Sequence, residues 1–307
     1  MDMRLFDLHC DTLLEAMNTG KSLRHNDLQL SFEKGGDFSP WIQTMAVFVE
    51  DSVRDRAARL IFDNAQCFLH SQLEENPGVA FCSSGEDLGA VCGSGGAGVM
   101  LSIEGGTPLM GDLDAVQELR GYGVRMMTLT WNGANEIGGG AGSPGGLTAF
   151  GRSVVAEMER CGMAVDISHA SDELFADVAS VAKKPFVASH SNSRVICPHR
   201  RNLTDAQFAE IVRRDGLVGI NLYPEFVTGG EDASLDDIYR HIEHFWSLGG
   251  EHVTAIGTDF DGASMPSCIP DAAHLERLGE YLLGKNTKES MVDDLFFNNA
   301  YNFFTGL

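Results

Sequence analysis

The sequence predicts an α/β protein of the (β/α)8 class, a TIM barrel, formed as a single domain over residues 1–307. Eight short, apolar, β-rich segments follow one another along the chain, and helical segments separate most of them. Repeated right-handed βα units build a parallel sheet, and eight of them close naturally into a barrel. A doubly wound open sheet is the structural alternative, but no Gly-x-Gly-x-x-Gly follows the first strand.

The predicted strands are short runs of the kind that a buried parallel sheet requires. In chain order they are residues 3–9, 41–49, 98–105, 124–131, 163–169, 185–191, 217–223 and 252–260. The predicted helices lie at residues 52–75, 112–123, 152–162, 171–182, 204–216, 234–249 and 287–304. Most of these helices start near Ser, Thr or Asp and many end at glycine, and Asp112 is a candidate N-cap.

Two glycine-rich stretches are interpreted as loops. Residues 93–98 precede a predicted strand, whereas a dinucleotide-binding fingerprint follows one. Residues 138–146 follow a strand but lack the Gly-Lys-Ser/Thr of a phosphate-binding loop. We expect the second stretch to form a flexible loop above the barrel.

Composition and charge restrict the partners. The formal net charge is −22, which gives no basic surface for nucleic acid and disfavours anionic membranes. The seven cysteines are scattered and form no Cys-x-x-Cys pair, so we expect free thiols of a reducing compartment. Without a signal-peptide pattern or a long apolar span, the expected location is the cytoplasm.

Unusual polar and aromatic residues stand at the carboxyl ends of the predicted strands. They are His9, Asp11, Glu104, Trp131, His169, His190, Tyr223 and Asp259. In a barrel these ends meet at one rim, where such enzymes carry their active sites. Because three histidines and three carboxylates crowded together would be costly without a cation, the pattern predicts a metal site. Imidazole and carboxylate ligands suit zinc, with manganese or iron as alternatives.

Several longer stretches carry a family resemblance, in family order and over almost the whole chain. They include "DLHCDTL", "LSIEGG", "RMMTLTWNGAN", "VDISHAS", "VASHSNSRVICPHRRNLTD", "VGINLY" and "IGTDFDG". The chain resembles the membrane (renal) dipeptidase family, zinc peptidases of the amidohydrolase superfamily. The resemblance implies a metal-dependent amidohydrolase barrel with two Zn²⁺ per chain, which hydrolyses dipeptides by a metal-bridged hydroxide. Substrates with a C-terminal D-residue are included in this expectation.

The resemblance also implies a role for each site residue. His9 and Asp11 would bind the first zinc, His169 and His190 the second, and Glu104 would bridge both ions. Asp259 would handle protons or the substrate amine, and Arg201 would bind the substrate carboxylate. Tyr223 would line the pocket. The catalytic residues are therefore expected to be Asp259 and Glu104.

Trp131 departs from the family pattern, because many members have a histidine at this position. That histidine is thought to polarise the scissile carbonyl or to stabilise the intermediate. An indole offers one N–H donor and a large apolar face, so Trp131 either alters the substrate range or only walls the pocket. Hydrolysis of N-acyl amino acids or lactones by the same site therefore stays an alternative. A barrel that binds ligands without catalysis is the alternative from another class, and family likeness alone predicts a bacterial homodimer.

Overall fold

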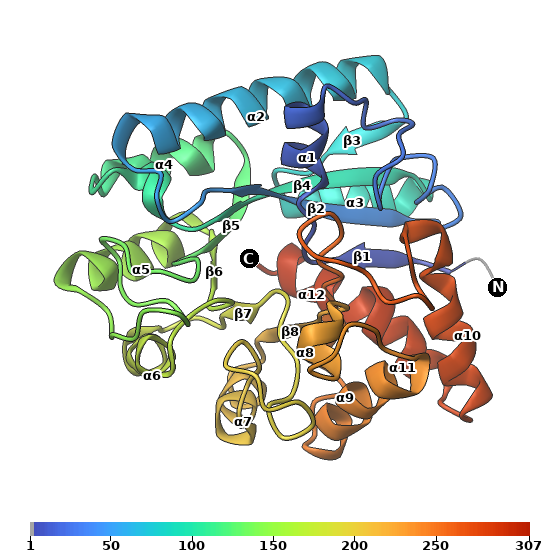
Figure 1. Cartoon of the computed structure of the whole chain (residues 1–307). Helices are drawn as coiled ribbons and strands as arrows, with labels where there is room; N and C mark the ends of the chain where they lie inside the picture. The colour runs from blue at the N-terminus through green and yellow to red at the C-terminus, as the bar shows by residue number, and fades with distance from the viewer. Residues whose placement is uncertain (1–2) are drawn as a thin grey trace.

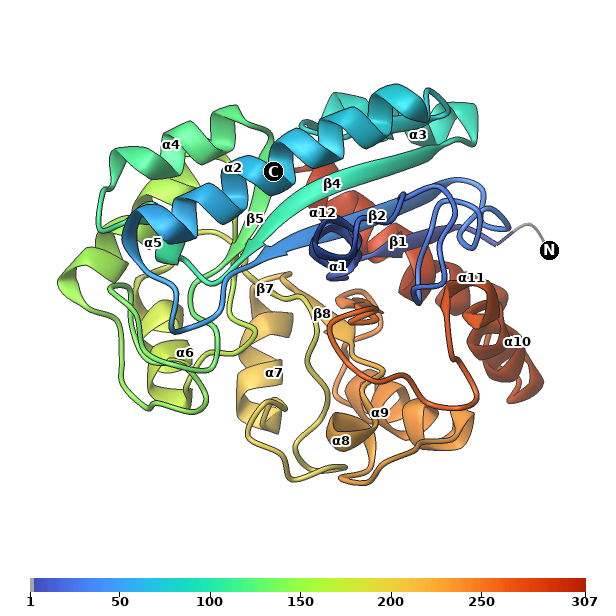
Figure 2. The same cartoon turned by 45° about the horizontal axis from the view of Figure 1, so that its top comes forward.

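A closed parallel β-barrel surrounded by helices forms the computed structural model, which describes residues 3–307 (Figures 1 and 2). The sheet has nine strands in the order β2-β1-β9-β8-β7-β6-β5-β4-β3, and an additional pairing of β2 with β4 closes the ring. Only β3 lies outside that ring, so eight strands form the barrel. The strands are β1 (Leu5–Asp7), β2 (Trp41–Phe48), β3 (Val79–Phe81), β4 (Ala97–Glu104), β5 (Val124–Thr128), β6 (Ala164–Asp166), β7 (Val187–Ala188), β8 (Leu217–Ile220) and β9 (Thr254–Ile256).

The predicted (β/α)8 class is confirmed, and each predicted strand overlaps a barrel strand. Most observed strands are shorter than predicted, because the chain leaves the hydrogen-bonded sheet before it reaches the polar residues at the end of each predicted strand. The segment predicted to run from 163 to 169 ends at Asp166, and His169 has the left-handed φ of 65°. The short strand β3 was not predicted; it pairs with β4 at the edge of the ring.

The helices are α1 (Thr12–Thr19), α2 (Asp55–Glu75), α3 (Gly85–Ser94), α4 (Asp114–Gly121), α5 (Ala149–Cys161), α6 (Asp172–Val181), α7 (Asp205–Arg213), α8 (Pro224–Val227), α9 (Leu235–Ser247), α10 (Glu276–Gly284), α11 (Glu289–Asp293) and α12 (Asn299–Thr305). Two 3₁₀ turns, η1 (Thr107–Leu109) and η2 (Ala272–His274), and the π-helical turn η3 (Asp294–Asn298) complete the elements. Helix α2 runs along the outside of the barrel (Figure 2). Over residues 3–307, none of these helices combines the length and apolarity needed to span a membrane.

Side-chain caps explain where several helices begin. The Thr204 and Ser234 side chains each form a capping box at the start of α7 and α9. The prediction of Asp112 as an N-cap was wrong, because Leu113 holds that position in α4. Asp112 still accepts a hydrogen bond from the backbone N–H of Asp114, so its carboxylate satisfies one of the free amides.

Two buried apolar clusters hold the framework together. The larger cluster includes many of the buried apolar residues of the strands and of the helices around them. The smaller one combines an apolar residue from each of the eight barrel strands with Phe297, Ala300 and Phe304 near the C-terminus. The Phe304 ring stacks on Phe6 of β1 at 5.5 Å, which ties the last helix to the first strand. Both clusters contain residues of the barrel strands, so their packing holds the strands in place and fixes the positions of the loops that follow them.

Candidate metal centre

The structure brings six of the predicted residues together beyond the carboxyl ends of the strands. They are His9, Asp11, Glu104, His169, His190 and Asp259. Glu104 is the last residue of β4, and the others follow β1, β6, β7 and β9 by two to four residues. These six side chains therefore lie close together at the carboxyl ends of the strands, where the sequence pattern placed them.

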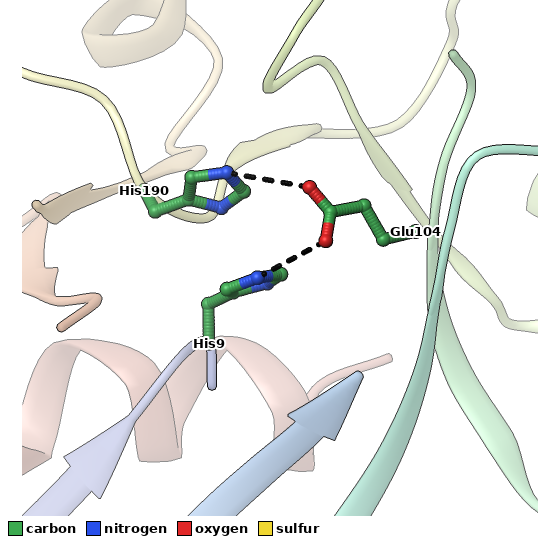
Figure 3. A group of neighbouring side chains, drawn as sticks. All are labelled: His9, Glu104 and His190. Atoms are coloured by element: carbon green, nitrogen blue, oxygen red, sulfur yellow. Dashed lines mark ion pairs between the residues drawn. The ribbon is translucent and has the colours of Figure 1, made fainter. Parts of the chain in front are cut away.

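The carboxylate of Glu104 lies among three histidine rings. Its Oε1 is 2.7 Å from Nε2 of His169 and 3.8 Å from Nε2 of His190. Its Oε2 is 3.4 Å from Nε2 of His9. Figure 3 shows the carboxylate beside the rings of His9 and His190, with one oxygen turned toward each ring. The two oxygens therefore face different rings, although one donor atom each of His9, Glu104 and His190 also lie within 4.8 Å of one another.

His9 also belongs to a group of carboxylates. Its Nε2 lies 3.2 Å from Asp11 Oδ2 and 3.8 Å from Asp259 Oδ1. Ligand atoms of His9, Asp11 and Asp259 all lie within 4.8 Å of one another. On the other side of Glu104, the Nε2 atoms of His169 and His190 are 3.0 Å apart. Donor atoms thus gather on both sides of one carboxylate.

Burial and neighbouring charges shift the pKa values of these groups in opposite directions. Burial lowers the pKa of His169 and lowers that of His190 further, so both rings are held neutral. Burial alone would raise the pKa of Glu104, but the His9 and His169 rings bring that pKa well below its usual range. Burial, together with the charge of Glu104, raises the pKa of Asp11 to about 7. Burial lowers the pKa of His9, but the charges of Glu104 and Asp11 raise it well above its usual range. His169 and His190, held neutral beside the ionised Glu104, are therefore in the protonation states that metal ligands require, whereas His9 would have to release a proton to a bound cation.

The donor set fits a divalent cation. Two Nε2 atoms at 3.0 Å cannot both turn lone pairs toward each other unless a proton or a cation lies between them. Oδ1 of Asp11 is buried and has no hydrogen-bond partner among residues 3–307. Imidazole nitrogen and carboxylate oxygen are preferred ligands of zinc and of related transition metals. These side chains can therefore hold metal ions.

Sequence reasoning missed the side chains that orient the ligands. The side-chain amide oxygen of Asn132, Oδ1, lies 3.0 Å from Nδ1 of His169, so that ring nitrogen carries the proton and Nε2 faces Glu104. Asp7, fully buried, accepts hydrogen bonds from the backbone N–H groups of His9 and Thr258. Asn132 belongs to the quoted stretch "WNGAN", but nothing in the sequence distinguishes it from a turn residue.

The glycine-rich loop at 138–146 lies against the same site and is less free than expected. The Ala141 N–H donates to the His169 carbonyl at 2.7 Å, and the Ser171 N–H donates to the Gly139 carbonyl. A Cβ on Gly140 would come within 2.2 Å of the Trp131 carbonyl oxygen. The glycines let the loop pack tightly beside His169, so the loop supports that ligand.

A cavity of about 920 Å³ opens onto the cluster. Glu104, His169 and Asp259 line it, as do the three predicted substrate residues Trp131, Arg201 and Tyr223. His9 and His190 do not line the cavity, and both are only 1% exposed. The site therefore has a buried floor of ligands and an accessible chamber above it.

Arg201 is unusual among the residues of this chamber. Only 6% of it is exposed, and neither Nε nor Nη2 has a hydrogen-bond partner among residues 3–307. Its guanidinium lies 5.3 Å from the centre of the Phe226 ring, which supports it from one face. Burial lowers the pKa of Arg201 to about 10, against the raising effect of Asp259 and Glu104, so it stays charged at neutral pH. A buried cation with two free donors is prepared for an anionic group.

The two aromatic residues have different surroundings. The Trp131 ring meets the Phe48 ring edge to face, with centroids 4.9 Å apart, and its centroid lies 6.1 Å from that of His169. The Tyr223 hydroxyl donates a hydrogen bond to Glu225. Trp131 and Phe48 therefore form an apolar wall, and Tyr223 is part of a polar rim.

Comparisons of the sequence with known proteins point to one family. Residues 1–305 match the family described as membrane dipeptidase, peptidase family M19. An uncharacterised protein encoded in the pqqA 5′ region of Klebsiella pneumoniae is 35% identical over 209 residues, 64% of this chain and 77% of that protein. Dipeptidase aclJ of Aspergillus oryzae is 35% identical over 203 residues, 64% of this chain. The matched region is 47% of the length of aclJ, so the alignment spans about half of that relative.

Comparisons of the structure agree. A solved metallo peptidase described as dipeptidase AC has a TM-score of 0.94 and 26% identity, covering 99% of this chain and 98% of that one. A metallo peptidase from Rhodobacter sphaeroides, solved with a phosphinate mimic of L-Ala-D-Ala, has a TM-score of 0.94 and 24% identity, covering 99% of both chains. The fold is thus shared over nearly the whole length.

Proposed function

Because this chain belongs to the membrane dipeptidase family, peptidase family M19, we propose that it is a zinc-dependent dipeptidase with two ions per chain. His9, Asp11 and Glu104 Oε2 would hold one ion. Glu104 Oε1, His169 and His190 would hold the other. When bound, such ions lower the pKa of a water molecule and polarise a carbonyl group. What supports this proposal is the placement of Glu104, whose two oxygens face separate groups of donors.

Arg201 would select the length of the substrate. Its Nε–H and Nη2–H lie on the same edge of the guanidinium, and neither nitrogen has a hydrogen-bond partner within the described part of the chain, residues 3–307. That edge can donate two parallel hydrogen bonds to one carboxylate. Because Arg201 lines the same chamber as Glu104 and Asp259, a C-terminal carboxylate held there leaves room for a short substrate. This is the observation that carries the proposal of a dipeptide.

Asp259 would accept and return the proton during hydrolysis. Its Oδ2 accepts a hydrogen bond from Asn221 Nδ2 at 2.9 Å, which fixes the carboxylate. Its Oδ1 is turned toward His9, at 3.8 Å from Nε2, and Asp259 lines the chamber. A positioned carboxylate can take a proton from the attacking water and pass it to the leaving amine. Asp259 would therefore act as the general base and then as the general acid.

Charge balance favours a dipeptide over an N-acyl amino acid. Six carboxylates line the chamber, those of Asp11, Glu15, Glu104, Glu225, Asp259 and Asp261, against the two guanidinium groups of Arg200 and Arg201. Two divalent ions would cancel the formal charge of about −4 that these side chains leave. A zwitterionic dipeptide preserves that balance, whereas an N-acyl amino acid brings an uncompensated negative charge. N-acyl amino acids stay the second candidate, because the Trp131–Phe48 wall offers an apolar surface for an acyl chain.

A substrate panel tests the proposal. The Zn²⁺-loaded protein should hydrolyse L-Ala-D-Ala and L-Ala-L-Ala and should leave tri-alanine and N-acetyl-alanine almost untouched. The D-Ala dipeptide is the first choice because the Rhodobacter protein of the same fold was solved with a mimic of it. Preferential hydrolysis of N-acetyl-alanine would establish the second candidate instead. No hydrolysis of any compound by fully loaded protein would contradict both.

A further inference from the structure

The carboxylate of Asp166, the last residue of β6, lies beneath the candidate metal centre and is completely buried. Its Oδ1 accepts hydrogen bonds from the backbone N–H groups of Ser168 and Ser189, at 2.9 and 3.0 Å. Its Oδ2 accepts hydrogen bonds from the hydroxyls of Thr128, at 2.7 Å, and Ser189, at 2.6 Å. Because the two amides can only donate, they determine which way the carboxylate faces.

The Ser189 hydroxyl links Asp166 to a metal-ligand candidate. A hydroxyl has one proton, and Ser189 donates it to Asp166. Ser189 Oγ also lies 2.8 Å from Nδ1 of His190, so it must accept a hydrogen bond there. Nδ1 of His190 therefore carries the ring proton. Nε2 of the same ring is left with its lone pair, 3.0 Å from His169 Nε2 and 3.8 Å from Glu104 Oε1.

We propose that Asp166 is a positioning residue, which acts through the Ser189 hydroxyl to hold His190 in the tautomer whose Nε2 faces the metal. The proton order runs from His190 Nδ1–H to Ser189 Oγ and from Ser189 Oγ–H to Asp166 Oδ2. Asn132 holds His169 in the same tautomer directly, because its side-chain oxygen Oδ1 lies 3.0 Å from Nδ1 of that ring. The inference rests on the proposed metal centre, since the tautomer matters only if Nε2 binds an ion.

Replacement of Asp166 by asparagine should reverse the proton order. The backbone N–H groups of Ser168 and Ser189 require an acceptor at the Oδ1 position, so the new amide oxygen stays there. The amide nitrogen then occupies the Oδ2 position and donates toward Ser189 Oγ. With its oxygen accepting that bond, the Ser189 hydroxyl is free to donate its own proton, and His190 Nδ1 at 2.8 Å is a nearer and stronger acceptor than Ser168 Oγ at 3.2 Å. The ring proton of His190 would move to Nε2, where it blocks a metal ion.

The test reads the tautomer directly and measures metal affinity separately. ¹⁵N-histidine NMR spectra of metal-free protein, with the His190 signals assigned by their loss in His190→Gln, report which ring nitrogen is protonated. Zn²⁺ affinity is measured by competition with a chelator, and thermal unfolding checks the fold. The variants are Asp166→Asn and Ser189→Ala. Thr128→Val is the matched control, because it removes a hydroxyl from the same Asp166 oxygen without touching His190.

We expect Nδ1 of His190 to be protonated in the wild type and in Thr128→Val, whichever Nε2 carries the proton between His169 and His190, and to be unprotonated in Asp166→Asn. Zn²⁺ affinity should fall about 10- to 100-fold in Asp166→Asn and should stay near the wild-type value in Thr128→Val. If Asp166→Asn does not fold, Ser189→Ala decides the question, with a mixture of tautomers and at least about 10-fold weaker Zn²⁺ binding expected. The same His190 tautomer in all folded variants, or equal weakening in Thr128→Val, would overturn the proposal. If the wild type showed no dipeptidase activity, only the proposed function would be contradicted, because neither the His190 tautomer nor the Zn²⁺ affinity depends on turnover.

Discussion

Asp7 and Asp166 bind equivalent partners on opposite sides of the barrel. The strands of these residues, β1 and β6, lie four positions apart in either direction around the ring. Each carboxylate accepts the backbone N–H two residues ahead, His9 for Asp7 and Ser168 for Asp166. Each also accepts both the N–H and the hydroxyl of one residue that follows a neighbouring strand of the sheet, Thr258 after β9 or Ser189 after β7. Buried aspartates thus anchor the strand ends from which His9 and His190 project.

Arg201→Lys should impair the enzyme more than its unchanged charge suggests. A lysine ammonium cannot reproduce two parallel hydrogen bonds from one planar edge. We expect kcat/KM for L-Ala-D-Ala to fall at least about 100-fold, mainly through KM, because charge-assisted hydrogen bonds contribute about 1.5–3 kcal/mol each. Steady-state kinetics checks this. Arg200→Lys is the control, since Arg200 is exposed at the edge of the chamber. Equal losses in the two variants would remove Arg201 from carboxylate recognition.

Asp259→Asn should abolish proton transfer while the site stays folded. Asp259 has a φ of 68°, a conformation that asparagine tolerates well, so the backbone need not change. We expect kcat to fall about 10²- to 10⁴-fold with a small change in KM. Glu225→Gln, at the rim beside Tyr223, should keep kcat within a few-fold of the wild-type value. If kcat of Asp259→Asn matched that of the control, another group would have to move the proton.

Trp131→Phe separates the two interpretations of this position. The edge-to-face contact with Phe48 indicates that Trp131 acts as a wall, and phenylalanine preserves an aromatic surface there. We therefore expect kcat to stay within a few-fold of the wild-type value, and Trp131→Ala to raise KM by enlarging the chamber. Kinetics with L-Ala-D-Ala measures both. A drop of more than about 10-fold in kcat for Trp131→Phe would instead assign catalytic stabilisation to the indole N–H.

Stability should fall in mild acid because of His241. This residue of α9 is buried, accepts a hydrogen bond from Ser193 N–H and donates one to the Val227 carbonyl. Burial lowers the pKa of His241 to about 4, below the unfolded value of about 6.5. Between these values the unfolded chain binds a proton that the folded chain does not, so stability decreases as pH falls. The contribution lost between pH 7.5 and 5.0 is about 2 kcal/mol.

Urea unfolding of the wild type and of His241→Asn at both pH values measures this contribution. The variant should be less stable at pH 7.5 and should lose about 2 kcal/mol less than the wild type on acidification. His252→Gln is the control, because it removes an imidazole that is exposed beside Asp215 instead of a buried one. Parallel pH profiles for all three proteins would show that His241 does not titrate in this range.

The sequence predicted the barrel and the ligand cluster for the same physical reason. Each strand is an apolar run, and a polar residue directly after such a run marks the carboxyl end of the strand, as at His190. The residues that orient the ligands lack that contrast. Asp166 lies inside the run 163–169 that was predicted as one strand, and Asn132 lies among turn-forming residues, so only the fold shows which rings they orient. The homodimer and the cytoplasmic location stay predictions.

The local sequence also explains why strand β3 and helix α3 were not predicted. Strand β3, Val79–Phe81, is only partly buried and lacks the longer apolar run that marks the barrel strands. Helix α3, "GEDLGAVCGS", contains three glycines, which weaken its helical propensity, although Ser84 caps it through the Asp87 N–H. The glycine loop at 138–146 was expected to be flexible because glycine suggests freedom. Its hydrogen bonds to the His169 segment became evident only in three dimensions.

Two cations are expected to share the Glu104 carboxylate. Crystals of the Zn²⁺-loaded protein, measured at the zinc absorption edge, test this arrangement most directly. Two anomalous peaks should lie on either side of Glu104, each about 2.0–2.2 Å from one of its oxygens and about 3.5–4 Å from the other peak. Peaks absent from this position, or a single peak that one Glu104 oxygen alone contacts, would contradict it.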